Sequence, residues 1–275
     1  MAGQPPLGDA VAFIGGGNMA SAIVGGLVAA GRAARDILVV EPFEVQRARL
    51  LAEFGVTASA AADASLARAG LVVWAVKPQA FREAAAPCRQ HVAGALQLSV
   101  MAGIRSGAIA AATGTERVVR AMPNTPALIG MGIAGLYARD AVSAAERAHV
   151  ETLLAPTGRT LWVDREADLD AVTALSGSGP AYVFYIVEAI MQAAVDMGLT
   201  PAQGKALALA TFAGASELAR RSDDAPALLR ERVTSKGGTT HAALAVLEAA
   251  GVKAAFIDAL RAAERRAAEL GDEFG

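Results

Sequence analysis

The stretch VAFIGGGNMASAIVGGL, residues 11–27, decides the fold of this chain. Its first four residues are apolar, three glycines follow at positions 15–17, and helix-forming residues begin at Met19. This order predicts a strand, a tight turn and a helix. Glycine lets the backbone turn sharply and approach an anion, while the free amides at the start of the next helix attract negative charge. Ala20 is small enough for the helix to pack closely on the strand, so the turn is a candidate phosphate-binding site.

A second apolar run supports a dinucleotide as the ligand. Residues 37–40 are apolar and end at Glu41, about 20 residues after Ala20, where an acid accepts the adenosine ribose hydroxyls. A purely structural glycine turn on a parallel sheet remains the alternative. Glu41 favours NADH because its charge repels a 2′-phosphate, whereas Arg47 and Arg49 lie close enough to accept one. The choice between NADH and NADPH therefore stays open.

Length and composition exclude several classes of protein. The 275 residues exceed one typical domain, so two are expected. Lys and Arg total 25 against 27 Asp and Glu, with no long basic run, which argues against nucleic acid as a partner. Cys88 is the one cysteine and fits a reducing compartment, and the three histidines are too scattered for a metal site. The first nine residues, MAGQPPLGD, do not resemble a signal peptide, so we expect a cytoplasmic protein.

Short apolar runs alternate with helical stretches as far as about residue 163, which is typical of a parallel sheet wrapped by helices. Several of these runs lack strict alternation, so we expect central strands that are buried on both faces. The predicted strands are residues 11–14, 37–40, 71–75, 96–100, 118–121, 133–137 and 160–163. The fold class is therefore α/β, with a Rossmann-like, doubly wound sheet as the dinucleotide-binding domain in residues 1–166.

Only helices are expected in residues 167–275. The most apolar of them, at residues 180–199, carries Glu188, Gln192 and Asp196 along one face, so we expect a buried helix and no membrane span. Further helices are expected at residues 201–220, 225–232 and 241–250. These helices carry more apolar surface than about 110 residues can bury alone, so we expect this half to form a dimer.

Candidate site residues follow the predicted strands, because ligands of doubly wound sheets bind beyond the carboxyl ends of the strands. Lys77 can bring an ammonium group to a phosphate or a carboxylate, and Asn124, between two prolines, can bind a carboxamide or a polar substrate. Either could instead be a solvated loop residue. Residues 234–240 form a second candidate anion site, with flexible glycines, hydroxyls and a helix start that suit a small carboxylate. There, Thr239 or Thr240 could also simply cap the helix.

Five segments resemble pyrroline-5-carboxylate reductase over nearly the whole chain: FIGGGNMASAI, AVKPQ, RAMPNTPALIGMG, ALSGSGPAYVF and VTSKGGTTHAALAVLE. The resemblance implies a dinucleotide-binding domain and a C-terminal helical dimerisation domain. It also implies a homodimer, often assembled into a pentamer of dimers, with each active site built across the dimer. The expected reaction transfers hydride from C4 of the nicotinamide of NADPH or NADH to the imine carbon of 1-pyrroline-5-carboxylate. The product is L-proline, in the last step of proline biosynthesis.

The resemblance also assigns site residues. It predicts Gly15, Gly17, Asn18 and Met19 in the loop that binds the pyrophosphate, and Ala75, Val76, Lys77 and Ala102 along the rest of the cofactor. The residue patterns described above add Glu41 and Asn124 as cofactor residues. The predicted substrate residues are Ser235, Gly238, Thr239 and Thr240, with Glu166 and Ser178 as further candidates. Thr240 is the predicted catalytic residue, whose hydroxyl would bond to the ring nitrogen. Lys236 replaces the proline usual in the family and adds positive charge near the expected carboxylate.

Two other functions remain as alternatives. A reductase or dehydrogenase of a small hydroxy or keto acid would need a catalytic lysine or histidine in the helical half, where the available residues form no convincing pair. A dinucleotide-binding sensor or assembly protein would bind cofactor without turnover, although the loop at Thr239 and Thr240 argues against it. The proton donor for the imine nitrogen stays open between a water molecule and Thr240.

Overall fold

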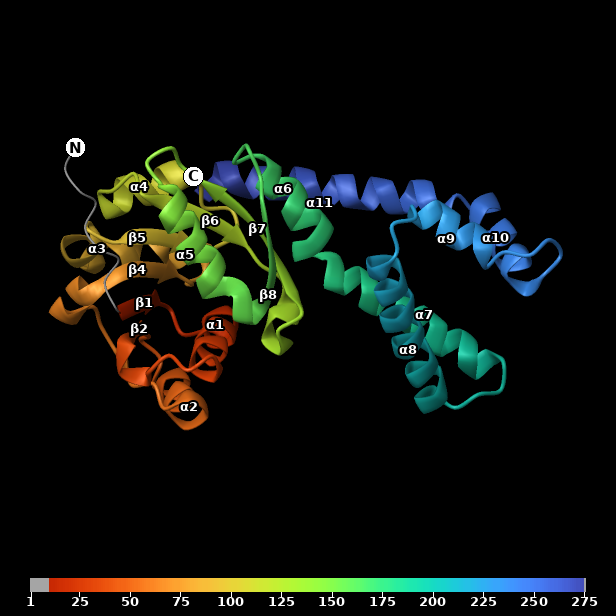
Figure 1. Ribbon diagram of the computed structural model, residues 1–275, viewed down its shortest axis with the longest axis horizontal. Helices are drawn as coiled ribbons and strands as arrows, with labels where there is room; N and C mark the ends of the chain where they lie inside the picture. The colour runs from red at the N-terminus through yellow and green to blue at the C-terminus, as the bar shows by residue number, and fades with distance from the viewer. Residues whose placement is uncertain (1–9, 275) are drawn as a thin grey trace. The chain divides into compact units, whose positions relative to one another are not determined.

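The protein is described by a computed structural model that covers residues 10–274, so the leading segment at residues 1–9 lies outside the described residues. The chain divides into two compact units, which are labelled by element in Figure 1. The first unit comprises residues 10–178 and 263–274, and the second comprises Gly179–Ala262. The boundary predicted after residue 166 thus differs from this division, in which the segment as far as Ser178 stays with the first unit.

The first unit is built on a sheet of eight strands within the described residues, in the order β3-β2-β1-β4-β5-β6-β7-β8. The strands are β1 (Ala10–Ile14), β2 (Ile37–Val40), β3 (Ala58–Ser59), β4 (Ala69–Trp74), β5 (Leu96–Ser99), β6 (Val118–Met122), β7 (Gly132–Ala138) and β8 (Gly158–Trp162). Every predicted strand is present, with ends that shift by up to two residues, and the short β3 is additional. Neighbouring strands are parallel except β6 and β7, which are antiparallel.

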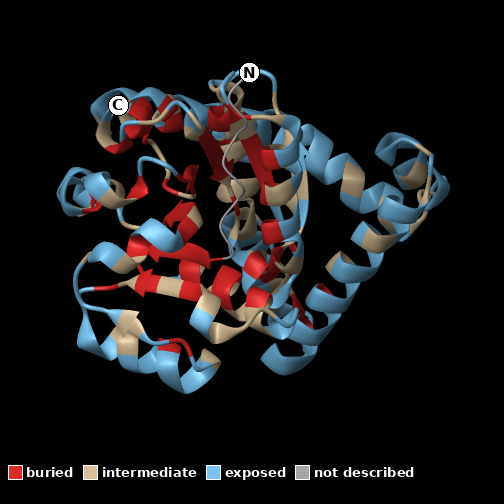
Figure 2. Ribbon diagram, turned by 60° about the vertical axis from the view of Figure 1, so that its left-hand side comes forward, coloured by how far each residue is buried: buried red, intermediate tan, exposed pale blue. Residues whose placement is uncertain are grey.

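Both faces of this sheet are covered, as the sequence predicted. Along β1, Val11 and Phe13 point into one apolar cluster, which includes residues of α1 (Asn18–Ala29), α2 (Glu44–Phe54) and α5 (Ala144–Leu154). Ala12 and Ile14 point into a second cluster with α3 (Phe81–Val92) and α4 (Ser106–Thr113). These four strand residues are at most 2% exposed. Figure 2 shows the resulting buried strands.

Two further segments pack on the sheet and complete the first unit. The helix α6 (Asp168–Val172) and the π-helical turn η6 (Thr173–Gly177) follow β8. A Cβ on Gly135 of β7 would lie 2.7 Å from a methyl carbon of Val172, so helix and strand pack in close contact. The last turns of α11 (Val252–Phe274) reach the loop after β5, where a Cβ on Gly103 would lie 3.2 Å from the carbonyl oxygen of Leu270.

The second unit contains α7 (Gly179–Asp196), α8 (Pro201–Arg221), α9 (Pro226–Arg232), α10 (Thr239–Ala249) and the first part of α11. The helices α7 and α8 are in close contact, because a Cβ on Gly204 would lie 2.8 Å from the Cβ of Ala194. The expectation that α7 is buried is not met within the described chain, where only its Val187 and Ala194 are buried. No helix in residues 10–274 is long and apolar enough to cross a membrane.

Candidate active site

The glycine turn after β1 fits tightly between its neighbours. Gly15 has a φ of +98°, and a Cβ there would lie 2.7 Å from the carbonyl oxygen of Ala75, so only glycine suits this position. The Gly15 amide donates to the carbonyl of Val40 at 2.8 Å, and the Ala75 amide donates to that of Ile14 at 2.8 Å. The turn therefore lies against the ends of both β2 and β4.

The helix that follows the turn presents its N-terminus without a side-chain cap. Gly17 is the N-cap residue of α1, and no described side chain bonds to the first amides of the helix. A Cβ on Gly17 would meet no described atom within 4 Å, so the backbone faces open space there. Amides in a first helical turn have no intrahelical acceptor and need one from elsewhere. The bare amides, the positive end of the helix and the open approach all fit the pyrophosphate of a dinucleotide.

The remaining predicted cofactor residues follow neighbouring strands. Residues 75–77 follow β4, Ala102 follows β5 and Asn124 follows β6, in the order of the strands across the sheet. Because β1, β4, β5 and β6 are parallel, these residues lie along the same edge of the sheet as the glycine turn. Lys77 is exposed at this edge. The structure thus brings the predicted cofactor residues together.

Asn124 has structural partners. Its side-chain nitrogen donates to the carbonyl of Ser176 at 3.2 Å, and its side-chain oxygen accepts from the amide of Ile133 at 3.0 Å. It therefore holds the π-helical turn η6 beside β7. The second N–H and the second lone pair of the oxygen remain for the predicted bond to a carboxamide or a polar substrate.

Glu41, which was predicted to accept the ribose hydroxyls, binds backbone amides of this chain. The residue is only 5% exposed. One carboxylate oxygen accepts from the amide of Gly16 at 2.7 Å, and the other accepts from the amide of Phe43 at 2.9 Å. Arg47 donates to the carbonyls of Glu41 and Pro42 at 3.0 and 2.7 Å, beside the same loop. Both oxygens of the expected ribose ligand therefore bind the backbone of this chain.

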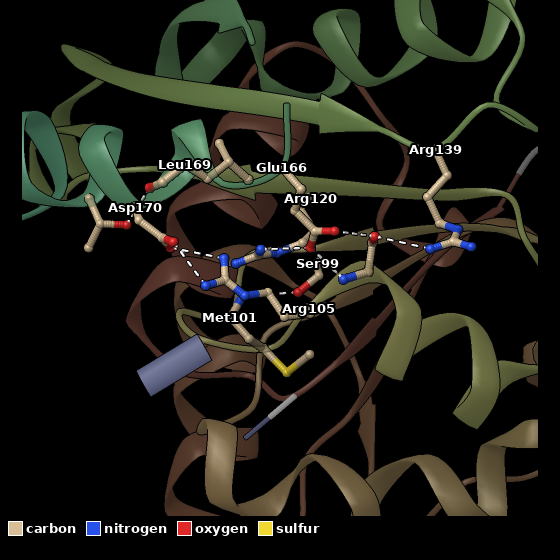
Figure 3. A network of polar contacts seen from close by, with 10 residues as sticks. Ser99, Met101, Arg105, Arg120, Arg139, Glu166, Leu169 and Asp170 are labelled. Atoms are coloured by element: carbon tan, nitrogen blue, oxygen red, sulfur yellow. Dashed lines mark hydrogen bonds and ion pairs between the residues drawn. The ribbon is translucent and has the colours of Figure 1, made fainter. Parts of the chain in front are cut away.

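Glu166, predicted as a substrate residue, belongs to a network of ion pairs (Figure 3), and its role toward substrate stays a prediction. It accepts from the amide and the hydroxyl of Ser106, both at 2.6 Å, and from Arg120 at 2.8 Å. Burial raises the pKa of Glu166, but the hydrogen bonds from Ser106 and Arg120 outweigh burial and leave this pKa below its usual value. Glu166 is thus a structural carboxylate that neutralises Arg120, which is 4% exposed.

The same network attaches α6 to the sheet. Arg105 donates to both carboxylate oxygens of Asp170, at 3.0 and 2.9 Å. These bonds explain why the first unit extends beyond residue 166. The sequence analysis missed the network, although Arg120 inside the apolar run VVRAM signals a buried charge that needs a partner. Ser178 ends the π-helical turn, with its amide bonded to the carbonyl of Thr173 at 2.8 Å, and its role toward substrate stays a prediction.

In the second unit, the predicted substrate loop leads directly into α10. Gly237 has a φ of +77°, and the amide of Gly238 donates to the carbonyl of Ser235 at 3.0 Å. Gly238 is the N-cap residue of α10, and no described side chain caps the helix. Thr239 is exposed and Thr240 is half-buried, and neither serves as the cap. The first amides of α10 are therefore available to an anion, as they are in α1.

Comparison with known proteins identifies close relatives. Residues 166–270 match the family model described as pyrroline-5-carboxylate reductase dimerisation, and residues 10–103 match that described as NADP oxidoreductase, coenzyme F420-dependent. The chain is 44% identical over 271 residues to the pyrroline-5-carboxylate reductase of Pseudomonas aeruginosa, covering 96% of this chain and 98% of the relative. It is 37% identical over 260 residues to that of Synechocystis, covering 94% and 97%.

Solved structures give the same result. The pyrroline-5-carboxylate reductase of Coxiella burnetii has a TM-score of 0.87 and 35% identity, over 96% of this chain and 98% of that one. The pyrroline carboxylate reductase of Plasmodium falciparum, solved with NADP bound, has a TM-score of 0.84 and 27% identity, over 98% and 100%.

Proposed function

This chain belongs to the pyrroline-5-carboxylate reductase family, and from that premise we propose how its residues perform the reaction. The chain is an oxidoreductase that reduces 1-pyrroline-5-carboxylate to L-proline with NADPH or NADH, the last step of proline biosynthesis. The bound cofactor supplies a hydride from its nicotinamide C4 to the imine carbon. The C-terminal helices are a dimerisation domain, so the chain forms a homo-oligomer.

The cofactor binds along the edge of the sheet at which its predicted residues gather. The amides of Gly17, Asn18 and Met19 hold the pyrophosphate, since α1 begins without a side-chain cap and faces open space. Gly15 supports this turn by fitting directly over Ala75. The residues after β4 and β5 line the remainder of the cofactor, and Lys77 adds positive charge near its phosphates.

The substrate binds at the start of α10. The loop from Ser235 to Gly238 and the first amides of the helix hold the carboxylate, and Lys236 adds positive charge beside it. The hydroxyl of Thr240 bonds to the ring nitrogen and so fixes the imine carbon relative to the hydride donor. A threonine hydroxyl is a weak acid, so we assign Thr240 to positioning this nitrogen for protonation and do not assign it as the proton source.

One observation carries this proposal: α1 and α10 both begin after a glycine and both lack a side-chain cap, which leaves one anion site in each unit. Loss of NADPH or NADH absorbance on addition of the imine tests the reaction. Thr240→Ala is expected to lower kcat/KM by about 10- to 100-fold, because one hydrogen bond to the reacting ring is lost, while leaving Tm unchanged.

The matched variants are Thr240→Ser, which keeps the hydroxyl, and Thr234→Ala, which removes a nearby hydroxyl that bonds only to the backbone carbonyl of Arg230. We expect both to retain most of the activity. An unchanged kcat/KM in Thr240→Ala would remove this residue from the mechanism, and absence of turnover with either cofactor would contradict the reaction itself.

For the assembly, we propose a pentamer of dimers in the cytoplasm. Exposed apolar residues of the second unit, such as Phe184 and Leu218, support a dimer, and the larger assembly rests on the family resemblance. A reducing compartment fits the one cysteine, Cys88, which is buried. Light scattering would distinguish two from ten chains of 27.9 kDa each, and cell fractionation would test the location.

A further inference from the structure

The two peptide groups of Gly16, the middle residue of the glycine turn, are held by Glu41, a predicted cofactor residue, and by two side chains outside the predicted cofactor set. The amide of Gly16 donates to Glu41 at 2.7 Å. The carbonyl of Gly16 accepts from the side-chain nitrogen of Gln46 and from the hydroxyl of Ser21, the latter at 3.3 Å. These partners come from the end of β2, from α2 and from α1, so three elements converge on a single residue and hold the peptide groups on both sides of its α-carbon.

Packing around Gly16 leaves this residue little freedom to move. A Cβ on Gly16 would lie 2.8 Å from a methyl carbon of Leu50 and 3.3 Å from the Cβ of Glu41. Glu41 itself is 5% exposed, and each of its carboxylate oxygens already accepts from a backbone amide, one from Gly16 and one from Phe43. Each carboxylate oxygen keeps one lone pair beyond its amide bond, but only 5% of the residue is exposed, so little of the carboxylate is open to ribose hydroxyls.

We propose that Glu41, together with Gln46, is a positioning residue of the pyrophosphate turn and that neither is a ligand of the adenosine ribose. This inference rests on the proposed cofactor site at the turn. Because Gly16 is held in place, the backbone amides that follow it are oriented in advance, and the turn is already arranged to receive the pyrophosphate. Because the Glu41 carboxylate is enclosed and its oxygens accept from two backbone amides, its charge is not expected to decide between a 2′-hydroxyl and a 2′-phosphate.

The two possible roles of Glu41 predict different cofactor affinities. If Glu41 bound the ribose, Glu41→Gln would weaken NADH and strengthen NADPH, and the ratio of their Kd values would change by more than about tenfold. If Glu41 positions the turn, the same variant weakens both cofactors by a similar factor of about ten, because the pyrophosphate is common to both.

The experiment is calorimetric titration of the oligomeric protein with NADH and with NADPH, in the absence of imine. Glu41→Gln and Gln46→Leu are each expected to raise both Kd values about tenfold with an unchanged ratio. Because both hold the same residue, Gly16, the double variant is expected to lose less than the product of the two single losses. The control is Glu53→Gln on the surface of α2, which loses only an exposed pair with Arg49.

Hydrogen exchange supplies a readout independent of cofactor. Peptides that cover residues 11–27 are expected to exchange faster in Glu41→Gln and in Gln46→Leu than in the wild-type protein and in Glu53→Gln. If Glu41→Gln does not fold, the same measurements on Gln46→Leu test the proposal. A changed ratio of the two Kd values, or unchanged affinities with unchanged exchange, overturns the proposal.

If the wild-type protein bound neither cofactor, the proposed cofactor site at the turn and this inference would both be contradicted. Wild-type protein that binds both, combined with full activity in Thr240→Ala, would contradict only the role given to Thr240. The two proposals can therefore fail separately.

Discussion

The two units differ in how far they bury their apolar residues within one chain. In the sheet unit, Phe13 and Trp74 are fully buried, and the buried Gln97 accepts from Trp74 at 2.8 Å. In the helical unit, Phe184 is 59% exposed and Leu218 is 70% exposed, in helices that Figure 2 shows as largely exposed. A sheet covered on both faces completes a core within one chain, whereas helices with wide apolar faces complete theirs against another copy. The proposed substrate loop lies in the unit that depends on this assembly.

The largest expected effect comes from placing a charge on the apolar surface of the helical unit. Phe184→Asp would bury an unpaired carboxylate between copies, so we expect the oligomer to dissociate and imine reduction to fall by at least about 100-fold. Analytical ultracentrifugation and the absorbance assay measure the two effects. The control is Leu51→Asp, which adds the same charge at a residue of the sheet unit that is 54% exposed, and it should leave the assembly intact. A dissociated variant with full turnover would contradict the dependence of the site on assembly.

A smaller effect is expected from a buried charge in the sheet unit. Glu166→Gln removes the charge that neutralises Arg120, and loss of one partner of a buried pair costs about 3 kcal/mol in free energy of unfolding. Urea unfolding at a fixed protein concentration measures this cost. Asp168→Asn is the matched control, because it removes an ion pair with the exposed Arg165, and we expect a change below about 1 kcal/mol. Equal effects would show that burial of Arg120 adds nothing to the cost of losing its partner.

The smallest expected effect is in the pH dependence of the sheet unit. The folded-state pKa of Glu166 is below the ordinary value of 4.5, so its ionised form stabilises the folded protein above that pH. This contribution is lost as the pH falls from about 4.5 through the lowered pKa. We therefore expect wild-type stability to fall on acidification in this range, with a shallower fall in Glu166→Gln. Urea midpoints between pH 6 and 3 provide the comparison, and parallel curves would exclude the contribution of Glu166.

Most of the sheet could be predicted because a strand buried on both faces appears in the sequence as a continuous apolar run. The two residues of β3 form too short a run to detect. The direction of β7 was not predictable either, since the same run suits a parallel and an antiparallel neighbour. Helices α7 to α10 were also predicted, with shifted ends, whereas no range was predicted for α11. The excess of apolar surface in these helices was predicted too, but not that α7 is so little buried within one chain.

The polar partners of the site were harder to predict. Glu41 was predicted as a cofactor ligand and Glu166 as a substrate residue, but both carboxylates accept from backbone amides that are 25 and 60 residues away along the chain. Spacing places an acid near the end of a strand, and only the fold shows whether the carboxylate meets a ligand or a backbone amide. No motif marks Gln46, because a glutamine on the surface of a helix is ordinary until its hydrogen bond to Gly16 is seen.

The contact between Gly103 and Leu270 has a consequence for the order in which the protein forms. The sheet is synthesised long before the last turns of α11 leave the ribosome. More than half of the chain must therefore be added after the loop that follows β5 before α11 can pack on that loop. Closing so long a loop costs entropy that the earlier contacts do not repay. A nascent chain arrested before Leu270 should therefore hold a sheet whose β5 loop is accessible to proteases, and release of the completed chain should protect it.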